Sequence, residues 1–330
     1  MLRFFAVRNQ IINPFKYHHS FTSPELPSDN GEQLYGRFLD TDIQSFSCSI
    51  MTTWENQLKI STAIIFTTST VCCATAFADT QDIKASNNQV SVQFISTDVN
   101  YTETGNGRLG TTIGTLDTEK GTVPGGALTL SVMRNLWLGD DYLQFQFSRN
   151  SGNTDYTGAL QSGGSYGSLV GQSGATMTDF SGRYGKGFEL SNNVMITPYG
   201  ELAHHKWQRN VNEGETYTNS YFGIGALAQF SPVQHLVLSA NALLGETFGS
   251  HIDVAGPNSF SGALGNSGLY KIGLSADYAF TKNLHGNVGV DYTSFKYGIS
   301  SEYPIGNSIY WEPDSTTKYT TVSVGIGYAF

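Results

Sequence analysis

Apolar and polar residues alternate along most of the chain after Asp79. The pattern is clearest over residues 319–330, where every second residue is large and apolar: Val322, Val324, Ile326, Tyr328 and Phe330. The residues between them are small or polar. A period of two residues predicts a β-strand that presents one apolar face and one polar face.

The same alternation recurs in ten segments, each of roughly the length that a tilted membrane strand needs. No apolar run long enough for a helical span follows Asp79, and a closed barrel is the other way to satisfy the backbone within hydrocarbon. We therefore predict an all-β fold, a closed antiparallel transmembrane β-barrel of ten strands, with eight and twelve strands as alternatives. The approximate segments are 90–101, 126–137, 142–150, 176–188, 194–207, 217–230, 236–249, 268–280, 285–299 and 318–330.

The connections between these segments alternate in length. Short connections predict periplasmic turns, and they lie at 138–141, 190–193, 231–235 and 281–284. Longer, Gly- and Ser-rich connections predict extracellular loops, and they lie at about 102–125, 151–175, 208–216, 250–267 and 300–317.

Aromatic residues gather at both ends of the predicted strands, as expected for the two interfaces of a membrane. At the periplasmic ends these are Trp137, Tyr142, Phe188, Phe230, Tyr278, Phe280, Tyr328 and Phe330. At the outer ends we expect a second girdle of Tyr101, Trp207, Tyr217, Phe248, Tyr270, Tyr292, Phe295, Tyr297 and Tyr319.

The N-terminal part predicts export. Residues 51–78 contain Lys59, an apolar run and the small-residue site Ala76-Phe77-Ala78, so we predict a signal peptide cleaved after Ala78. The mature barrel is then 79–330. Residues 1–50 have no periodic apolar face, and we interpret them as a disordered extension from a start codon assigned too early.

Composition narrows the class of partner. The formal net charge is −9 and no cluster of Lys and Arg opposes it, so nucleic acid is excluded as a partner. All three cysteines precede Asp79, so the mature chain has no disulfide framework.

The C-terminal residues Tyr328-Ala329-Phe330 resemble the terminal signature of Gram-negative outer-membrane barrels. That resemblance implies recognition by the barrel-assembly machinery and a place in the cell outer membrane, in contact with outer-membrane lipid and lipopolysaccharide. In size and loop style the chain is most similar to the small OmpA-like, opacity-type barrels, whose usual strand number is eight.

The inward face of the predicted barrel is polar and carries charges of both signs. We expect a buried lumen network of paired side chains: Asp179, Arg183, Glu201, Lys271, Asp277 and Asp291. The alternative is that the acidic excess lines a narrow path for cations.

Enzymatic and metal chemistry have little support. His251 and Asp253 share a strand face near a rim, as the His–Asp pair of the omptin proteases does, but the adjacent acids Asp140-Asp141 lie in a periplasmic turn. His204 and His205 point to opposite faces of a strand. We therefore assign no catalytic, cofactor-binding or metal-binding residue.

Two functions follow from this sequence. The first is an outer-membrane surface barrel whose extracellular loops bind host or surface ligands and support envelope structure, with Tyr156, Tyr166, Tyr303, Tyr310 and Trp311 as loop aromatics. The second is a narrow, porin-like channel for small ions or solutes. An outer-membrane barrel enzyme ranks third.

Overall fold

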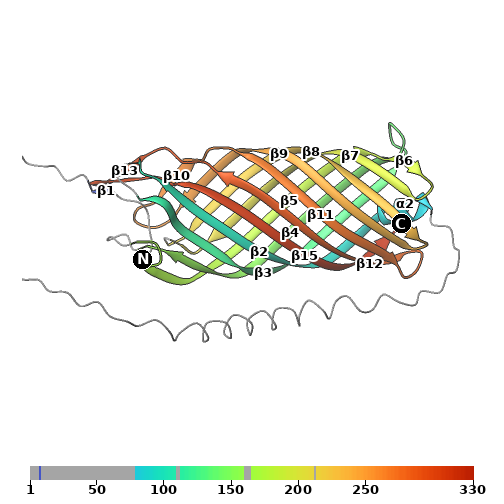
Figure 1. The fold of residues 1–330 in the computed structure, drawn as a ribbon, viewed down its shortest axis with the longest axis horizontal. Coiled ribbons are helices and arrows are strands. Elements are labelled where there is room, and N and C mark those ends of the chain that lie inside the picture. Colours follow the sequence, from blue (N-terminus) through green and yellow to red (C-terminus); the bar gives the residue numbers. More distant parts are fainter. Residues whose placement is uncertain (1–6, 9–78, 109–111, 160–164, 212) are drawn as a thin grey trace, which may run out of the picture. The chain divides into compact units, whose positions relative to one another are not determined.

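Ten long antiparallel strands close into a barrel, as the alternation predicts (Figure 1). The structure is a computed structural model, and it describes residues 7–8, 79–108, 112–159, 165–211 and 213–330. The ring closes where β15 pairs with β2. In ring order its strands are β2 (Gln89–Asn106), β3 (Ile113–Arg134), β4 (Asp141–Gly158), β5 (Leu169–Lys186), β7 (Val194–Arg209), β8 (Glu215–Val233), β9 (Leu236–Val254), β11 (Gly268–Ala279), β12 (Leu284–Tyr297) and β15 (Asp314–Ala329).

Shorter elements lie at the two ends of the barrel. At the periplasmic end these are helix α2 (Thr80–Ser86) and strand β6 (Phe188–Ser191). At the opposite end β10 (Phe260–Ala263) extends β9, and β13 (Tyr303–Ile305) and β14 (Ser308–Tyr310) form a hairpin whose β14 pairs with β1 (Val7–Arg8). No helix among the described residues is long and apolar enough to cross a membrane.

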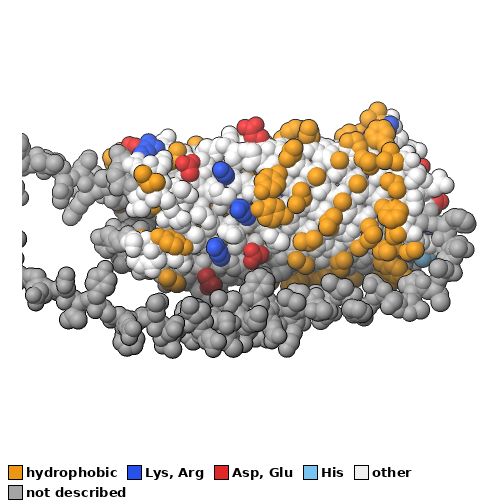
Figure 2. Space-filling view, viewed as in Figure 1, with side chains coloured by type: hydrophobic (Ala, Val, Ile, Leu, Met, Phe, Trp, Pro, Cys, Tyr) orange, Lys and Arg blue, Asp and Glu red, His pale blue; other side chains and the backbone are white. Residues whose placement is uncertain are grey.

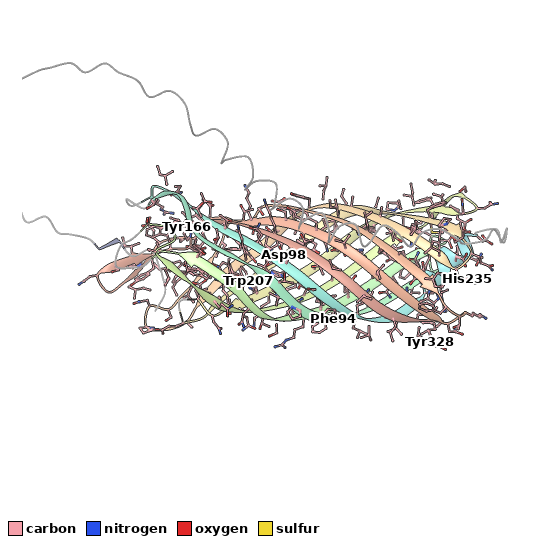
Figure 3. The ribbon with its side chains drawn as sticks, turned by 60° about the horizontal axis from the view of Figure 1, so that its bottom comes forward. Phe94, Asp98, Tyr166, Trp207, His235 and Tyr328 are labelled. Carbon is pink, nitrogen blue, oxygen red and sulfur yellow. The ribbon has the colours of Figure 1, made fainter. Side chains whose placement is uncertain are left out.

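An apolar band surrounds the periplasmic half of the barrel wall. Phe94 of β2 is 57% exposed on the outer face, whereas Asp98, four residues further along the same strand, begins a polar surface (Figure 3). In the space-filling view, hydrophobic side chains cover the same half and charged side chains begin beyond it (Figure 2). Exposed apolar side chains are costly in water, so this band is the part of the wall that meets lipid.

The strands are longer than the sequence pattern predicted. A membrane strand needs about ten residues, but β2 has 18 residues and β3 has 22. Much of the predicted loops 102–125 and 151–175 is therefore strand. The prediction failed because the outer strand ends are mostly polar or small on both faces, with only scattered apolar side chains, so the hydrophobic alternation stops while backbone pairing continues.

Six residues of the predicted outer girdle point inward instead. They are Tyr101, Trp207, Tyr217, Phe295, Tyr297 and Tyr319, each no more than 8% exposed. Their rings pack against one another inside the barrel; the Tyr101 and Trp207 ring centroids, for example, are 5.1 Å apart. Phe248 and Tyr270 do face outward, at 46% and 43% exposure. Residues an even number of positions apart on a strand point to the same face. Tyr101 is eight residues after the inward-facing Gln93, so its side chain also points inward.

The predicted signal peptide, its cleavage site at Ala76 and Ala78, and the extension 1–50 lie outside the described residues, apart from Val7–Arg8. They stay predictions.

Candidate functional site

A polar chamber occupies the part of the barrel that the membrane surrounds. Its volume is about 310 Å³. Amide and hydroxyl side chains line most of it, including Gln93, Gln144, Gln146 and Ser323. At the outer end the lining stops at His205, Phe295 and Tyr319, and at the periplasmic end it includes Ser86 and Asn87 beside helix α2. The chamber therefore lies in the barrel interior between these aromatic residues and helix α2.

Three of the six predicted network residues meet in the middle of the chamber. Glu201 accepts contacts from Arg183 on β5 and from Lys271 on β11, whose Nζ lies 3.0 Å from Glu201 Oε1. Tyr221 donates its hydroxyl to the same carboxylate. Glu201 is 1% exposed, and two cations with a hydroxyl donor compensate its buried charge.

The other three predicted residues lie apart from this centre. Asp179 Oδ1 is 2.6 Å from His205 Nδ1 near the outer end, and Tyr319 lies 3.2 Å from the other ring nitrogen of that histidine. Asp277 Oδ1 is 2.6 Å from Nδ1 of His285 near the periplasmic end. Asp291 accepts a hydrogen bond of 3.3 Å from Asn241. The predicted set therefore forms separate pairs along the barrel, and whether it has a role beyond packing stays a prediction.

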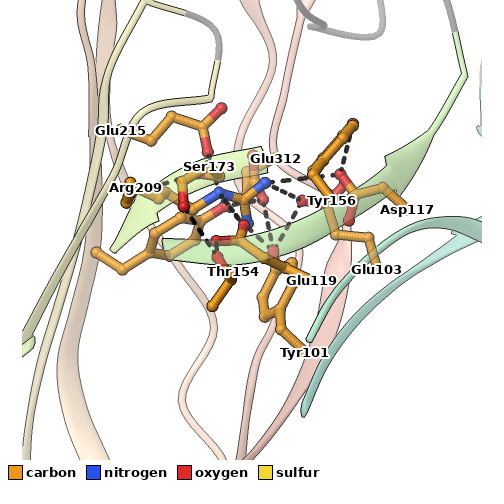
Figure 4. A network of polar contacts seen from close by, with 12 residues as sticks. Tyr101, Glu103, Asp117, Glu119, Thr154, Tyr156, Ser173, Arg209, Glu215 and Glu312 are labelled. Atoms are coloured by element: carbon orange, nitrogen blue, oxygen red, sulfur yellow. Dashed lines mark hydrogen bonds and ion pairs between the residues drawn. The ribbon is translucent and has the colours of Figure 1, made fainter. Parts of the chain in front are cut away.

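The outer end of the barrel is filled by a cluster that sequence reasoning missed (Figure 4). We call it the outer plug. Its centre is the guanidinium of Arg209, which is 1% exposed and lies within ion-pair distance of four carboxylates. A fifth carboxyl group, that of Glu312, accepts from the Tyr101 and Tyr217 hydroxyls. The outer plug consists of Tyr101, Glu103, Asp117, Glu119, Thr154, Tyr156, Trp207, Arg209, Glu215, Tyr217 and Glu312.

Ion pairs and hydroxyl donors hold the outer plug together. Arg209 Nε is 3.2 Å from a carboxylate oxygen of Glu119 and 3.2 Å from one of Glu215. Tyr101 donates to Glu103 over 2.8 Å, and its ring lies 4.8 Å from the Arg209 guanidinium carbon. The aromatic rings exclude water and attract the cation at the same time.

Negative charge exceeds positive charge inside the outer plug. Arg209 is its one cation against five carboxyl groups, and an unpaired buried charge is costly. Burial raises the pKa of Glu312, which the segment between β14 and β15 brings into the plug, well above its ordinary range, and the charge of Glu103 raises it further. Burial in the outer plug therefore favours the protonated form of the Glu312 carboxyl group.

Helix α2 fills the periplasmic end of the barrel, and we call it the inner plug. Ile83 is completely buried, and Lys84 Nζ lies 3.0 Å from Asp140 and 2.9 Å from Glu189 in the periplasmic turns. The hydrogen bond to Glu189 raises the pKa of Lys84 above its ordinary value of 10.5. The stabilisation from the two Lys84 ion pairs is therefore fully present at neutral pH, and it is lost only as the pH rises through that raised pKa.

The signal for the outer plug was present in the sequence as spacing. Glu103 follows Tyr101 by two residues, and Arg209 follows Trp207 by two, so each charge continues the inward face of its strand. The predicted loops 102–125 and 208–216 place these charges in solvent, whereas the structure places them inside the barrel.

The remaining candidate residues do not assemble a centre. His204 is exposed outside the barrel, and His205 is buried inside it, as predicted. His251 Nε2 lies 3.4 Å from Asp253 and 2.8 Å from the Ser261 hydroxyl, so one ring nitrogen meets both. Within the residues that the structure describes, no group of His, Cys, Asp and Glu could hold a metal ion.

The C-terminal pair lies at the periplasmic boundary of the band. Tyr328 and Phe330 are 58% and 50% exposed, and the Phe330 backbone donates to the carbonyl of Asn88 over 3.1 Å. Their recognition by the assembly machinery stays a prediction.

Three comparisons place this architecture among known proteins. No protein-family model and no curated protein match the sequence. Among solved structures, the outer membrane protease OmpT from Escherichia coli aligns with a TM-score of 0.50 at 10% identity, over 74% of this chain and 97% of OmpT. The Ail protein of Yersinia pestis has a TM-score of 0.27 at 14% identity, over 74% and 99%. OprG from Pseudomonas aeruginosa has a TM-score of 0.31 at 9% identity, over 74% and 98%.

The closed ring, the apolar band and the likeness to OmpT define the class of protein. The chain is a ten-stranded β-barrel of the Gram-negative outer membrane. At this low identity the likeness shows the fold alone.

Proposed function

We propose that the protein is a surface barrel that binds partners outside the cell through the outer part of its wall and its extracellular hairpins. The observation that carries the proposal is an apolar surface far from lipid. Val170 of β5 is 69% exposed and Tyr166 is 46% exposed. Val170 lies ten residues along β5 from Phe180 in the apolar band, or roughly 25 Å further out for a tilted strand.

These two residues belong to one patch of the outer wall. Val170 pairs with Thr157, which pairs with Thr118, and the Tyr166 hydroxyl lies 2.9 Å from the Thr118 hydroxyl. Apolar and aromatic side chains that stay exposed in water mark interaction sites more often than chance. Strand pairing holds Val170 in place, and the contact with Thr118 joins Tyr166 to the same wall, so a partner would meet a preformed surface.

The partner surface differs from the loop aromatics expected from the sequence. Tyr156, Tyr310 and Trp311 are 3%, 7% and 2% exposed, so they belong to the interior. Of the five loop aromatics predicted for recognition, Tyr166 is the one most exposed, and Tyr303 stacks on Phe260 at 4.8 Å.

The channel alternative has less support because both ends of the chamber are filled by buried side chains. It requires that the outer plug and the inner plug both move. An enzymatic role has the least support, because His251 uses one nitrogen toward both Asp253 and Ser261, whereas a relay needs one nitrogen for each.

Binding by whole cells tests the proposal. Cells that display the barrel are probed against an array of matrix proteins and glycans, and the double variant Tyr166→Ser/Val170→Ser should bind its ligand at least about tenfold more weakly. The matched control is Val233→Ser, which removes an apolar side chain of 47% exposure at the periplasmic end. Equal binding by the double variant and the wild type, or an equal loss in the control, contradicts the proposal.

A further inference from the structure

Outward-facing cations lie just beyond the apolar band on one side of the barrel. Arg149 of β4 and Lys206 of β7 both pair with Thr178 of β5, so the three residues form one row across neighbouring strands. Neighbouring strands are about 4.8 Å apart, which separates the two cationic residues by about 10 Å across the Thr178 hydroxyl. Both side chains are long enough to reach a common point above Thr178.

Aromatic residues occupy the next row toward the periplasm. Phe147 pairs with Phe180, and Phe180 pairs with His204. The two phenylalanines are 46% and 54% exposed on the lipid-facing wall. The basic row therefore lies at the height where the apolar band ends and lipid headgroups begin.

The pairing of charges differs between the barrel interior and this row. Cations inside the barrel have carboxylate partners, as Arg183, Lys271 and Arg209 do. Neither Arg149 nor Lys206 makes an ion pair within the part of the chain that the structure describes. Two unpaired cations above an apolar surface, in a protein of net charge −9, complement an anionic group attached to an acyl chain.

We propose that Arg149, Thr178 and Lys206 bind the phosphate group of an anionic lipid in the outer leaflet, whose acyl chains lie against Phe147 and Phe180. The guanidinium of Arg149 donates to two phosphate oxygens, and Lys206 and the Thr178 hydroxyl donate to others. The expected lipid is the phosphorylated glycolipid of this leaflet.

A second row of cations supplies a matched control. Lys318 of β15 and Lys120 of β3 both pair with Asn100 of β2, so their spacing equals that of Arg149 and Lys206. Here, however, Asp155 is the cross-strand neighbour of Lys120 on β4. The next row toward the periplasm contains Asp98 in place of phenylalanine. Carboxylates offset this second row, and no aromatic surface lies directly below it.

The test measures lipid binding by the purified barrel in zwitterionic nanodiscs. Bisphosphorylated lipid A, dephosphorylated lipid A and inorganic phosphate are titrated against the wild type, Arg149→Gln/Lys206→Gln and Lys120→Gln/Lys318→Gln. We expect wild-type affinity for bisphosphorylated lipid A to fall about tenfold or more in the first variant and less than about twofold in the second. All positions are on the outer surface, and gel mobility before and after boiling checks that each variant folds.

Three results would overturn the inference. Equal losses in the two variants would mean that surface charge attracts the lipid without a site. Equal affinity for dephosphorylated lipid A would mean that the phosphate is not recognised. Binding of inorganic phosphate as tight as that of lipid A would mean that the site takes free phosphate and that the aromatic row has no part in it.

Discussion

Nε of Arg209 lies 3.2 Å from Oε2 of Glu119, and both side chains are closed off from solvent, at 1% and 0% exposure. This contact joins β7 to β3 through the barrel interior, because the two strands are not neighbours in the ring. Arg209 thereby connects parts of the wall that are separated by β4 and β5. The outer plug depends on this one cation.

Replacement of Arg209 by Ala should destabilise the barrel strongly. The variant removes the cation that four buried carboxyl groups share, and loss of one partner from a buried ion pair costs about 3–5 kcal/mol. Urea unfolding in detergent micelles, followed by tryptophan fluorescence, measures the free energy of unfolding. Arg149→Gln is the control, because it removes an exposed outward charge, and its effect should stay within about 0.5 kcal/mol. Equal stabilities of the two variants would refute the role given to Arg209.

Rising pH should loosen the outer plug. Because burial raises the pKa of Glu312 above its ordinary value of 4.5, the closed plug binds more protons than an open one, and its stability falls as the pH rises from 4.5 through the raised pKa. The charged groups that share the plug with Glu312 are Glu103, Asp117, Glu119, Arg209 and Glu215.

Tryptophan fluorescence can follow this change. In a Trp54→Phe/Trp137→Phe background the remaining tryptophans, Trp207 and Trp311, are both buried at 0% and 2% exposure. Acrylamide quenching should increase with pH, and Glu312→Gln should reduce that increase because the amide cannot ionise. A quenching profile that is flat in pH, or unchanged by Glu312→Gln, would show that the plug does not release protons.

Conductance should require the loss of both plugs. Ile83 is completely buried in the inner plug, so Ile83→Asp should expel helix α2 by placing an unpaired charge in an apolar site. In planar bilayers the wild type, Ile83→Asp and Arg209→Ala should conduct little, whereas Ile83→Asp/Arg209→Ala should open a path through the chamber. Steady conductance of the wild type would favour the channel function instead.

The sequence predicted the membrane half of the barrel well. In that half one face must contact lipid, so Val322, Val324 and Ile326 are all large and apolar, and the period of two is visible. The strand number and most side-chain directions followed from that constraint. Tyr142 of the predicted periplasmic girdle is an exception, because it is 2% exposed and lines the interior chamber on the same strand face as Gln144. Beyond the band both faces are polar, and β2 and β3 continue past Asn100 and Lys120 without an apolar face to mark them.

The site was harder to predict for a different reason. The alternation of side chains along a strand shows which residues point inward, and it placed Arg183, Glu201 and Lys271 inside the barrel. It does not show which inward residues meet across the lumen, because that depends on the stagger between distant strands. Glu312 is the extreme case: it reaches the interior from a segment outside the strands, and no strand period extends to it.

The long strands of this barrel also decide where a partner can first touch it. The hydrogen-bonded barrel wall continues well past the lipid boundary. Tyr166 and Val170 therefore lie on an extension of the barrel beyond the lipid headgroups. Sugars that project from the membrane would screen a short barrel, whereas this one lifts its contact surface into the medium at a fixed height.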